Sequence, residues 1–314
     1  MADRVIVVAG PTASGKTKLS IELAKKLNGE IVSADSMQIY KGMDIGTAKA
    51  DSSETGQIPH HMLDVAEPWE EYSVARYVNE ASACCDDIIA RGKIPVITGG
   101  TGLYIDSLLS GRSFAERQTG DNRLRDELSE KYDAVGGEAM LRELRQIDPC
   151  RAEKLSPADK RRIVRALEIY MLTGKTATEH DRRTRELPKA YEACYFVLNF
   201  KDRADLYERI DKRVDMMAEQ GLFDEVKGLL ASGLPENSTA MQAIGYKEVV
   251  ASLKGEMSSQ EALELIKQSS RRYAKRQLTW FRRNQEAFWL ELDCPPDYDK
   301  ALSQALDYIG AKWK

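Results

Sequence analysis

The chain has 314 residues, of which 42% are hydrophobic and 31% charged, and its formal net charge is −4. This is the balance of a globular protein with a sizeable core, in one large or two modest domains. A negative net charge argues against non-specific coating of nucleic acid but permits a local basic groove. No signal-peptide core and no apolar run of roughly 18 residues is present, so we expect a cytoplasmic protein that does not enter a membrane.

The cysteines agree with a reducing compartment. Their number is odd, and no two have the CxxC spacing: Cys84, Cys85, Cys150, Cys194 and Cys294. We therefore expect free thiols and neither a disulfide framework nor a zinc site. Nothing in the sequence indicates an obligatory protein partner, and we expect a monomer.

Strands and helices alternate through the first third of the chain. The β-branched run 4–10 predicts a buried parallel strand, and leucines spaced four apart over 16–27 predict a helix. Residues 29–36 predict a second strand, 72–89 a helix, and 93–104 a third strand that runs into a glycine-rich turn. This alternation predicts an α/β fold of the P-loop NTPase-like kind, with a parallel sheet flanked by helices.

The pattern changes near residue 111. From 112 to 191 it is helical and dense in charges of both signs, and a strand pattern returns at 194–200. We therefore predict a core domain made of residues 1–111 and 192–314, whose C-terminal part is mostly helical. A helical insertion domain, 112–191, interrupts it.

The segment GPTASGKT matches the phosphate-binding pattern G-x-x-x-x-G-K-[ST] in full, between a predicted strand and a predicted helix. Backbone N–H groups of such a loop hold phosphate oxygens, Lys16 adds a positive charge, and the Thr17 hydroxyl is placed to bind Mg²⁺. The alternative is a glycine-rich turn without a ligand. The predicted phosphate site consists of Gly10, Pro11, Thr12, Ala13, Ser14, Gly15, Lys16 and Thr17.

The acidic residues around this loop differ from those of a typical ATPase. Such enzymes place a second acidic Mg²⁺ partner at the end of a hydrophobic strand, where this chain has Thr98. The best acid at a strand end is Asp35, and strand ends of open α/β sheets face the ligand crevice. We predict that Asp35 handles the nucleophile; the alternative is an aspartate that only caps its turn.

Basic residues gather in several places. The stretch 266–284 carries seven Lys or Arg, no acid, and three interleaved aromatic residues, which favours nucleic acid over a merely solvated helix face. Two weaker clusters are 159–165 and 181–185. Arg209 and Arg213 lie four residues apart, so they face one side of a helix and could clamp a diphosphate; surface ion pairs with Asp205 and Asp211 are the alternative.

Several long blocks are similar to those of one family. GPTASGKT, SADSMQIYKGMDIGTAK, IPHHMLDV, TGGTGLYI, DKRRIVRALEIY, AIGYKE and RRYAKRQLTWFRR together resemble the bacterial tRNA dimethylallyltransferases, also called tRNA isopentenyltransferases, over essentially the whole length. The C-terminal Cys/His zinc finger of eukaryotic relatives is absent, as in bacterial members. The pattern gives His60 and His61, in IPHHMLDV, no derivable role, and it favours a structural role over a metal site.

The resemblance implies transfer of a dimethylallyl group from dimethylallyl diphosphate to the exocyclic N6 amine of adenosine 37 of tRNA, with Mg²⁺ as cofactor. It implies catalytic roles for Asp35, Lys16, Thr17 and Thr101, with Thr17 as the metal ligand. The insertion domain would contact the anticodon stem-loop. Predicted tRNA-binding residues are Asp35, Ser36, Met37, Gln38, Thr101, Arg123 (or Arg125), Lys160, Arg161, Arg162, Arg165, Gln242, Gly245, Lys247, Arg271, Arg272, Lys275 and Arg276.

Two other functions remain open at this level. A small-molecule or nucleotide kinase would use Asp35 to orient an acceptor hydroxyl and the arginines of 181–185 as a lid, and it would turn over ATP. A tRNA-binding module without catalysis would need a vestigial loop, against which the intact Gly15-Lys16-Thr17 argues. Whether ATP also binds the loop is not decided by the sequence.

Overall fold

The computed structural model describes all residues except 1–2, 52–54, 57, 112–122 and 187. The chain divides into two compact units, Met1–Leu109 with Ala190–Lys314, and Ser110–Lys189. The elements of the first unit are β1 (Asp3–Ala9), α1 (Lys16–Leu27), β2 (Gly29–Ser33), β3 (His60–His61), α3 (Val74–Ala90), β4 (Ile94–Gly99), α4 (Gly102–Leu109), β5 (Tyr191–Phe200), α10 (Arg203–Glu219), α11 (Leu222–Ala231), the short 3₁₀ helix η1 (Ala240–Gln242), α12 (Tyr246–Leu253), α13 (Ser259–Phe281), β6 (Phe288–Leu292) and α14 (Tyr298–Lys312).

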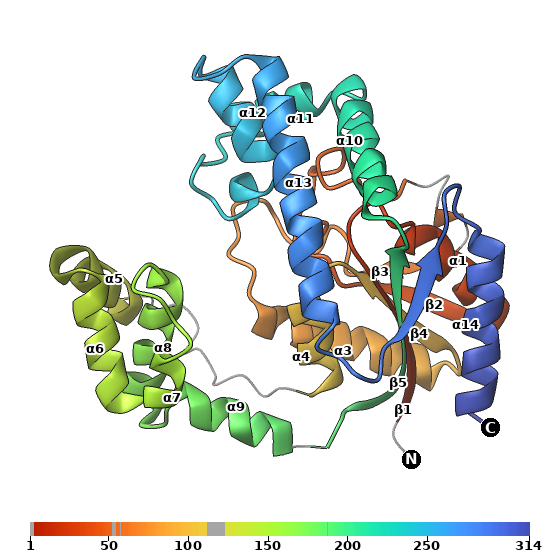
Figure 1. Ribbon diagram of the computed structural model, residues 1–314, viewed down its shortest axis with the longest axis horizontal. Coiled ribbons are helices and arrows are strands. Elements are labelled where there is room, and N and C mark those ends of the chain that lie inside the picture. The colour runs from red at the N-terminus through yellow and green to blue at the C-terminus, as the bar shows by residue number, and fades with distance from the viewer. Residues whose placement is uncertain (1–2, 52–54, 57, 112–122, 187) are drawn as a thin grey trace. The chain divides into compact units, whose positions relative to one another are not determined.

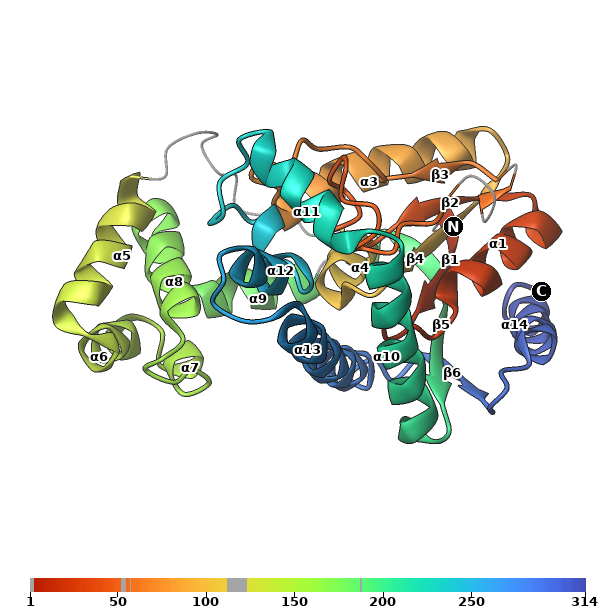
Figure 2. The same cartoon turned by 90° about the horizontal axis from the view of Figure 1, so that it is seen from above.

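The described strands form one six-stranded sheet in the order β3-β2-β4-β1-β5-β6, and every pairing is parallel (Figure 1). Helices α1 and α14 cover one face, and α3 and α4 cover the other (Figure 2). Because both faces are covered, β1 is a continuous apolar run, fully buried from Val5 to Ala9. The predicted parallel sheet flanked by helices is confirmed.

Two strands were not predicted. β3 contains only His60 and His61, too few residues to show an alternating pattern, and β6 lies in a region that we expected to be helical. In β3 the His61 Nε2 atom lies 2.8 Å from an oxygen of Glu30, a buried carboxylate that also pairs with Arg91 and Lys93. These contacts lower the pKa of Glu30 well below its usual range, the Arg91 hydrogen bonds most. His61 thus joins an edge strand to a buried charge.

A second apolar core lies within the same unit. It joins the loop after β2 to α10, α11, α12 and α13, through buried side chains that include Tyr40, Met43, Val214, Tyr246 and Ile266. Figure 1 shows α10 and α13 side by side, extending away from the strand ends. This helical layer stands over the carboxyl ends of β1, β2 and β4, where ligands of open α/β sheets bind.

The second unit is helical in its described part. It contains α5 (Arg123–Val135), α6 (Gly137–Ile147), α7 (Pro149–Ala152), α8 (Lys160–Thr173) and α9 (Ala177–Glu186). Its own core includes Leu128, Met140, Leu144, Ile163 and Leu167. None of the helices described in either unit combines the length and the apolar character required to cross a membrane.

Candidate functional site

The phosphate-binding loop connects β1 to α1. Residues 10–15 form it, and α1 begins at Lys16. Gly15 has φ 87°, and a Cβ atom there would collide with the phenol of Tyr298 from α14. Glycine is therefore required at this position by both backbone conformation and close packing. A distant helix, α14, therefore packs directly against the loop at Gly15.

Lys16 lies within the pocket formed by this loop. Its Nζ donates a 2.7 Å hydrogen bond to the Pro11 carbonyl. Burial, followed by the positive charge of Arg213, lowers the pKa of Lys16 to about 7, and the negative charge of Asp35 opposes them. An anion placed beside Lys16 would raise this pKa again, because it favours the charged form. The site is therefore built to receive negative charge.

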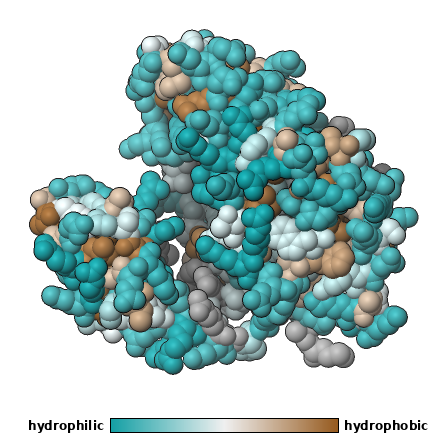
Figure 3. Space-filling model, in the orientation of Figure 1, coloured by the Kyte–Doolittle hydropathy of each residue, from teal (hydrophilic) through white to brown (hydrophobic). Residues whose placement is uncertain are grey.

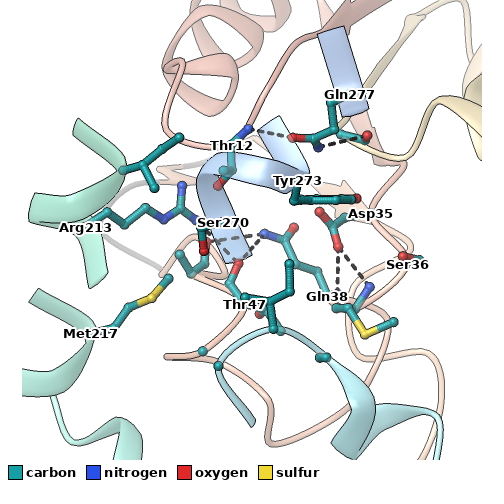
Figure 4. Close-up of a pocket in the computed structure, with 18 of the residues that line it drawn as sticks. Thr12, Asp35, Ser36, Gln38, Thr47, Arg213, Met217, Ser270, Tyr273 and Gln277 are labelled. Atoms are coloured by element: carbon teal, nitrogen blue, oxygen red, sulfur yellow. Dashed lines mark hydrogen bonds between the residues drawn. The ribbon is translucent and has the colours of Figure 1, made fainter. Parts of the chain in front are cut away.

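Asp35 follows β2 and lies in the same pocket as Lys16. One carboxylate oxygen accepts the N–H groups of Met37 at 2.9 Å and Gln38 at 3.3 Å. These are the contacts of an aspartate that caps its turn, which was the alternative to a catalytic role in the sequence analysis. Capping is therefore one part of what Asp35 does. The same contacts also fix the carboxylate in place, facing the cavity (Figure 4). Capping and a catalytic role are thus compatible.

Thr101 steadies the Asp35 turn without lining the pocket. Its N–H donates to the Ala34 carbonyl at 3.1 Å, and its hydroxyl oxygen accepts the Ser36 N–H at 3.1 Å. Thr98, at the usual position of an acidic metal partner, instead accepts a 2.8 Å hydrogen bond from Ser20 on α1. Within the described residues, no group of three or more His, Cys, Asp or Glu could hold a metal ion.

The pocket has a volume of about 430 Å³ and lies wholly within the larger unit (Figure 4). One part is polar and carries Lys16, Asp35 and Arg213. Another part is apolar and comes from α10, α13 and the segment before α12. The lining consists of Thr12, Lys16, Thr17, Asp35, Ser36, Met37, Gln38, Gly46, Thr47, Ala48, Thr98, Gly99, Gly100, Ile210, Arg213, Val214, Met217, Gln242, Ala243, Ile244, Gly245, Lys247, Ile266, Ser270, Tyr273, Arg276 and Gln277.

The two α10 arginines have different surroundings. Arg213 lines the pocket and approaches the Thr47 carbonyl at 3.5 Å. Arg209 lies behind the phosphate-binding loop, where it donates to the Ala13 carbonyl at 3.1 Å and to the Tyr298 hydroxyl at 3.3 Å. Arg209 is not among the lining residues, so in this structure the two do not face the cavity as one clamp.

The loop 44–48 forms one wall of the pocket and was not predicted to belong to the site. The carboxylate of Glu225 accepts the N–H groups of Asp44, Ile45 and Gly46 at 2.9, 2.7 and 3.1 Å. It also accepts a 2.6 Å hydrogen bond from the Tyr246 hydroxyl. One side chain of α11 therefore fixes the wall that carries Gly46, Thr47 and Ala48.

Helix α13 divides its basic residues between two environments. Arg271 forms a 2.5 Å ion pair with Asp211 of α10, and Lys267 pairs with Asp215 at 2.7 Å. Arg272 and Lys275 are exposed and lie outside the pocket, whereas Arg276 lines it. Figure 3 shows a mostly hydrophilic surface over this part of the larger unit. The positive charge of the basic stretch 266–284 is thus partly neutralised by aspartates of α10, which lie far from this stretch in the sequence.

The basic residues predicted in the helical unit lie on α5 and α8. Lys160 pairs with Asp133 at 2.6 Å, Arg165 with Glu168 at 2.7 Å, and Arg162 with Asp159 at 3.8 Å, while Arg161 is exposed. Arg123, predicted to touch tRNA, is the exposed first residue of α5. Its alternative Arg125 pairs with the buried carboxylate of Glu168 at 2.9 Å, which is a structural contact.

Three pocket residues of α13 escaped the sequence analysis. Ser270, Tyr273 and Gln277 line the cavity at helical spacing, three and four residues apart. This spacing can be seen in the sequence. We interpreted the stretch as an exposed nucleic-acid-binding surface because of the basic residues that lie between these three. Burial, and next the charge of Asp35, raises the pKa of Tyr273 to about 12, so its phenol stays protonated.

A phosphate-binding loop at the first strand–helix junction of a parallel sheet, facing a carboxylate across a partly apolar pocket, defines a P-loop protein suited to group transfer. The family model described as "IPP transferase" matches residues 38–284, and a model described as "Isopentenyl transferase" matches 3–65. The chain belongs to the IPP transferase family.

Similar proteins agree with this assignment. The chain is 44% identical over 313 residues to a tRNA dimethylallyltransferase of Thermoanaerobacter sp., covering 99% of each chain. Its fold is similar to that of the full-length tRNA isopentenylpyrophosphate transferase from Bacillus halodurans, with a TM-score of 0.74, 40% identity and coverage of 99% and 96%. It is also similar to a eukaryotic dimethylallyltransferase acting on tRNA, with a TM-score of 0.79, 33% identity and coverage of 92% and 74%.

Proposed function

We propose that this chain transfers a dimethylallyl group from dimethylallyl diphosphate to the exocyclic N6 amine of adenosine 37 in tRNA, next to the anticodon, and releases diphosphate. The observation that carries the proposal is the presence of Lys16 and Asp35 in one pocket of about 430 Å³. The names of the relatives support this activity, and they give no support to a kinase.

The phosphate-binding loop is the place for the donor's diphosphate. Negative charge grows on the leaving diphosphate as the bond between oxygen and the allylic carbon weakens. Backbone N–H groups of the loop and of the α1 terminus, together with Lys16 and Arg213, stabilise that charge where it develops. Arg209 supports the loop from behind through the Ala13 carbonyl.

Mg²⁺ fits this donor set. Thr17 lines the pocket beside Lys16 and offers one hydroxyl oxygen, and Mg²⁺ in phosphate sites takes few protein ligands and completes its shell with phosphate oxygens and water. A bound Mg²⁺ would neutralise part of the charge on the diphosphate. The loop N–H groups would then position the diphosphate, and Lys16 and Arg213 would supply the remaining positive charge.

The apolar part of the pocket suits the hydrocarbon group. Val214, Met217 and Ile244 line it, and the hydrocarbon side chains of Val214 and Ile244 offer no group that would capture an allylic cation. Water that entered could do so, and the apolar wall keeps it out. The pocket therefore combines anion binding with an apolar surface, which a phosphate-transfer enzyme acting on a polar acceptor would not need.

Asp35 is placed to act as the general base. In the reaction a bond forms between the adenine N6 and the allylic carbon, the carbon–oxygen bond to diphosphate breaks, and one N6 proton passes to the Asp35 carboxylate. The adenine amine is a weak nucleophile because its lone pair is delocalised into the ring, so a hydrogen bond from N6 to Asp35 helps it. The base must leave its stack to reach this pocket.

The tRNA surfaces follow from charge and position. Around the pocket we assign Ser36, Gln38, Gln242, Gly245 and Lys247 to the acceptor nucleotide's surroundings, and the exposed cations of α13 to phosphates. Arg123, Arg161 and their neighbours in Ser110–Lys189 would contact the anticodon stem-loop. A tRNA substrate also implies that the protein works in the cytoplasm.

An isotope assay tests the activity. The protein is incubated with labelled dimethylallyl diphosphate or with labelled ATP, each with and without tRNA. Label should enter tRNA only from the prenyl donor, with one diphosphate released per transfer, and a tRNA carrying inosine at position 37, which lacks the N6 amine, should accept none. Formation of ADP with an added acceptor, and no prenylated tRNA, would establish a kinase instead.

A further inference from the structure

One buried side chain of α13 joins the phosphate-binding loop to the end of β4. The Gln277 amide nitrogen donates to the Gly100 carbonyl at 3.0 Å, and its amide oxygen accepts the Thr12 N–H at 3.0 Å. Gln277 is only 5% exposed. Because an amide is both a donor and an acceptor, one side chain satisfies two backbone groups, the Thr12 N–H and the Gly100 carbonyl. Figure 4 shows its amide beside Thr12, with the hydrogen bond between them drawn as a dashed line.

The turn after β4 contacts the same helix at Gly100 and at Gly102. Gln277 donates to the Gly100 carbonyl, and the indole of Trp280 packs on Gly102. A Cβ atom at Gly100 would collide with the Gln277 amide, so the backbone approaches that side chain closely. The three-residue spacing of Gln277 and Trp280 places both side chains on one face of α13.

This contact reaches the catalytic carboxylate through a short series of hydrogen bonds. Thr101, next to Gly100, accepts the Ser36 N–H and donates to the Ala34 carbonyl. Those two residues flank Asp35. The donor loop at Thr12 and the acceptor side at Asp35 are therefore both attached to Gly100 and Thr101, and Gln277 makes the connection on the donor side.

We propose that Gln277 is a positioning residue, which sets the distance between the donor's diphosphate loop and the carboxylate that receives the N6 proton. The proposal rests on the proposed function. A displacement of about 1 Å between reacting groups lowers the rate of a bond-forming step by roughly 100-fold. In this role Gln277, which also lines the pocket, acts through the backbone of Thr12 and Gly100.

Gln277→Met tests the proposal, because methionine is close in length and removes both hydrogen bonds. Leaving buried backbone groups unsatisfied should lower kcat roughly 5- to 100-fold. The Kd for tRNA should change less than about twofold, and the affinity for inorganic diphosphate, measured by calorimetry without turnover, should fall several-fold. A merely structural role would lower the melting temperature and tRNA affinity while leaving kcat of the folded protein unchanged.

Gln277→Glu gives a second, independent readout. The introduced carboxylate still accepts the Thr12 N–H. Its other oxygen has no proton to donate, so it lies against the Gly100 carbonyl as a second acceptor. Once protonated it can donate to Gly100 as the amide does. The ratio of the variant's kcat to the wild-type kcat should therefore rise as the pH falls from about 8 to 6. Dividing by the wild-type profile compares the two proteins at each pH, since Lys16, Asp35 and Tyr273, which line the same pocket, are present in both.

Gln268→Met is the matched control, because Gln268 is an exposed glutamine on the same helix. It should leave kcat and both affinities unchanged. The proposal is overturned if Gln277→Met keeps the wild-type kcat, or, should that variant not fold, if the Gln277→Glu ratio does not change with pH. A wild-type protein that transfers no prenyl group would instead overturn the proposed function, and diphosphate affinity would still report on the loop.

Discussion

Lys16 illustrates how burial prepares a single residue for an anion. With its pKa lowered to about 7, this lysine is partly neutral at physiological pH until an anion arrives. Diphosphate binds the charged form, so above pH 7 binding requires proton uptake. We predict that affinity for inorganic diphosphate falls by up to roughly tenfold per pH unit above 7, as measured by calorimetry between pH 6 and 9.

Lys16→Arg provides the control for that prediction. A guanidinium stays protonated throughout this range, so the part of the pH slope that comes from Lys16 should disappear. The titration of diphosphate itself is common to both proteins and cancels in the comparison. Equal slopes for the wild type and Lys16→Arg would show that Lys16 does not titrate near neutrality.

The second residue-scale prediction concerns Asp35. Asp35→Asn keeps the shape and can still accept the N–H groups of Met37 and Gln38 through its carbonyl, so the turn should survive. An amide cannot take a proton at neutral pH. We therefore expect kcat to fall about 10²–10⁴-fold in single-turnover assays, with the Kd for tRNA changed far less. A normal rate, or a loss traced only to Mg²⁺ affinity, would remove Asp35 from this role.

At the scale of elements, α13 combines an inner face that contacts the core with an outer basic face. The ion pair between Arg271 and Asp211 leaves Arg272, Lys275 and Arg276 as better candidates for phosphate contacts. Changing these three to glutamine should weaken tRNA binding and reduce the slope of log K against log salt by up to roughly 0.7–0.9 per lost contact. Binding of the donor to the free protein should change little when only Arg272 and Lys275, which lie outside the pocket, are replaced.

A charge-matched triple variant controls for net charge. Lys25, Lys26 and Lys300 are exposed on α1 and α14, and replacing them with glutamine removes the same number of positive charges. Filter binding at several salt concentrations should show a wild-type slope for this variant. If both triples behave alike, α13 has no specific part in holding tRNA.

The loop 44–48 is an element without regular structure that depends on one carboxylate. Glu225→Gln keeps the size of the side chain, but its NH₂ group faces backbone N–H groups that need an acceptor. We expect kcat/KM for the donor to fall about tenfold and stability to fall by about 1–3 kcal/mol. Denaturant unfolding and steady-state kinetics measure the two effects. Asp224→Asn, at an exposed neighbouring position, should change neither kcat/KM for the donor nor the stability.

At the scale of the whole molecule, the sequence predicted what depends on local pattern. The strands at β1, β2, β4 and β5 and the phosphate-binding loop follow from apolar runs and glycine spacing, and the structure contains each of them. β3 and β6 are too short or too ambiguous to carry such a pattern. Element ends were close but not identical, since the helix expected at 72–89 spans Val74–Ala90.

The pocket could be predicted only in part, because it depends on strand order and on distant contacts. Lys16 was assigned to it from the phosphate-binding pattern, and Asp35 from its place at a strand end. Gln277 and the 46–48 wall approach them from remote parts of the chain, through packing that no local pattern encodes. Arg209 lies on the helix on which it was predicted. Its guanidinium donates to the Ala13 carbonyl of the phosphate-binding loop and does not line the cavity.

The order of strands has a consequence for how the chain matures on the ribosome. β1 lies between β4 and β5, so its second edge stays open until residues 191–200 have been synthesised, after the whole of Ser110–Lys189. Tyr298, which packs on Gly15, emerges later still. A nascent chain therefore carries an unfinished phosphate-binding loop for most of its translation, and competence to bind the donor arises only near the end of synthesis.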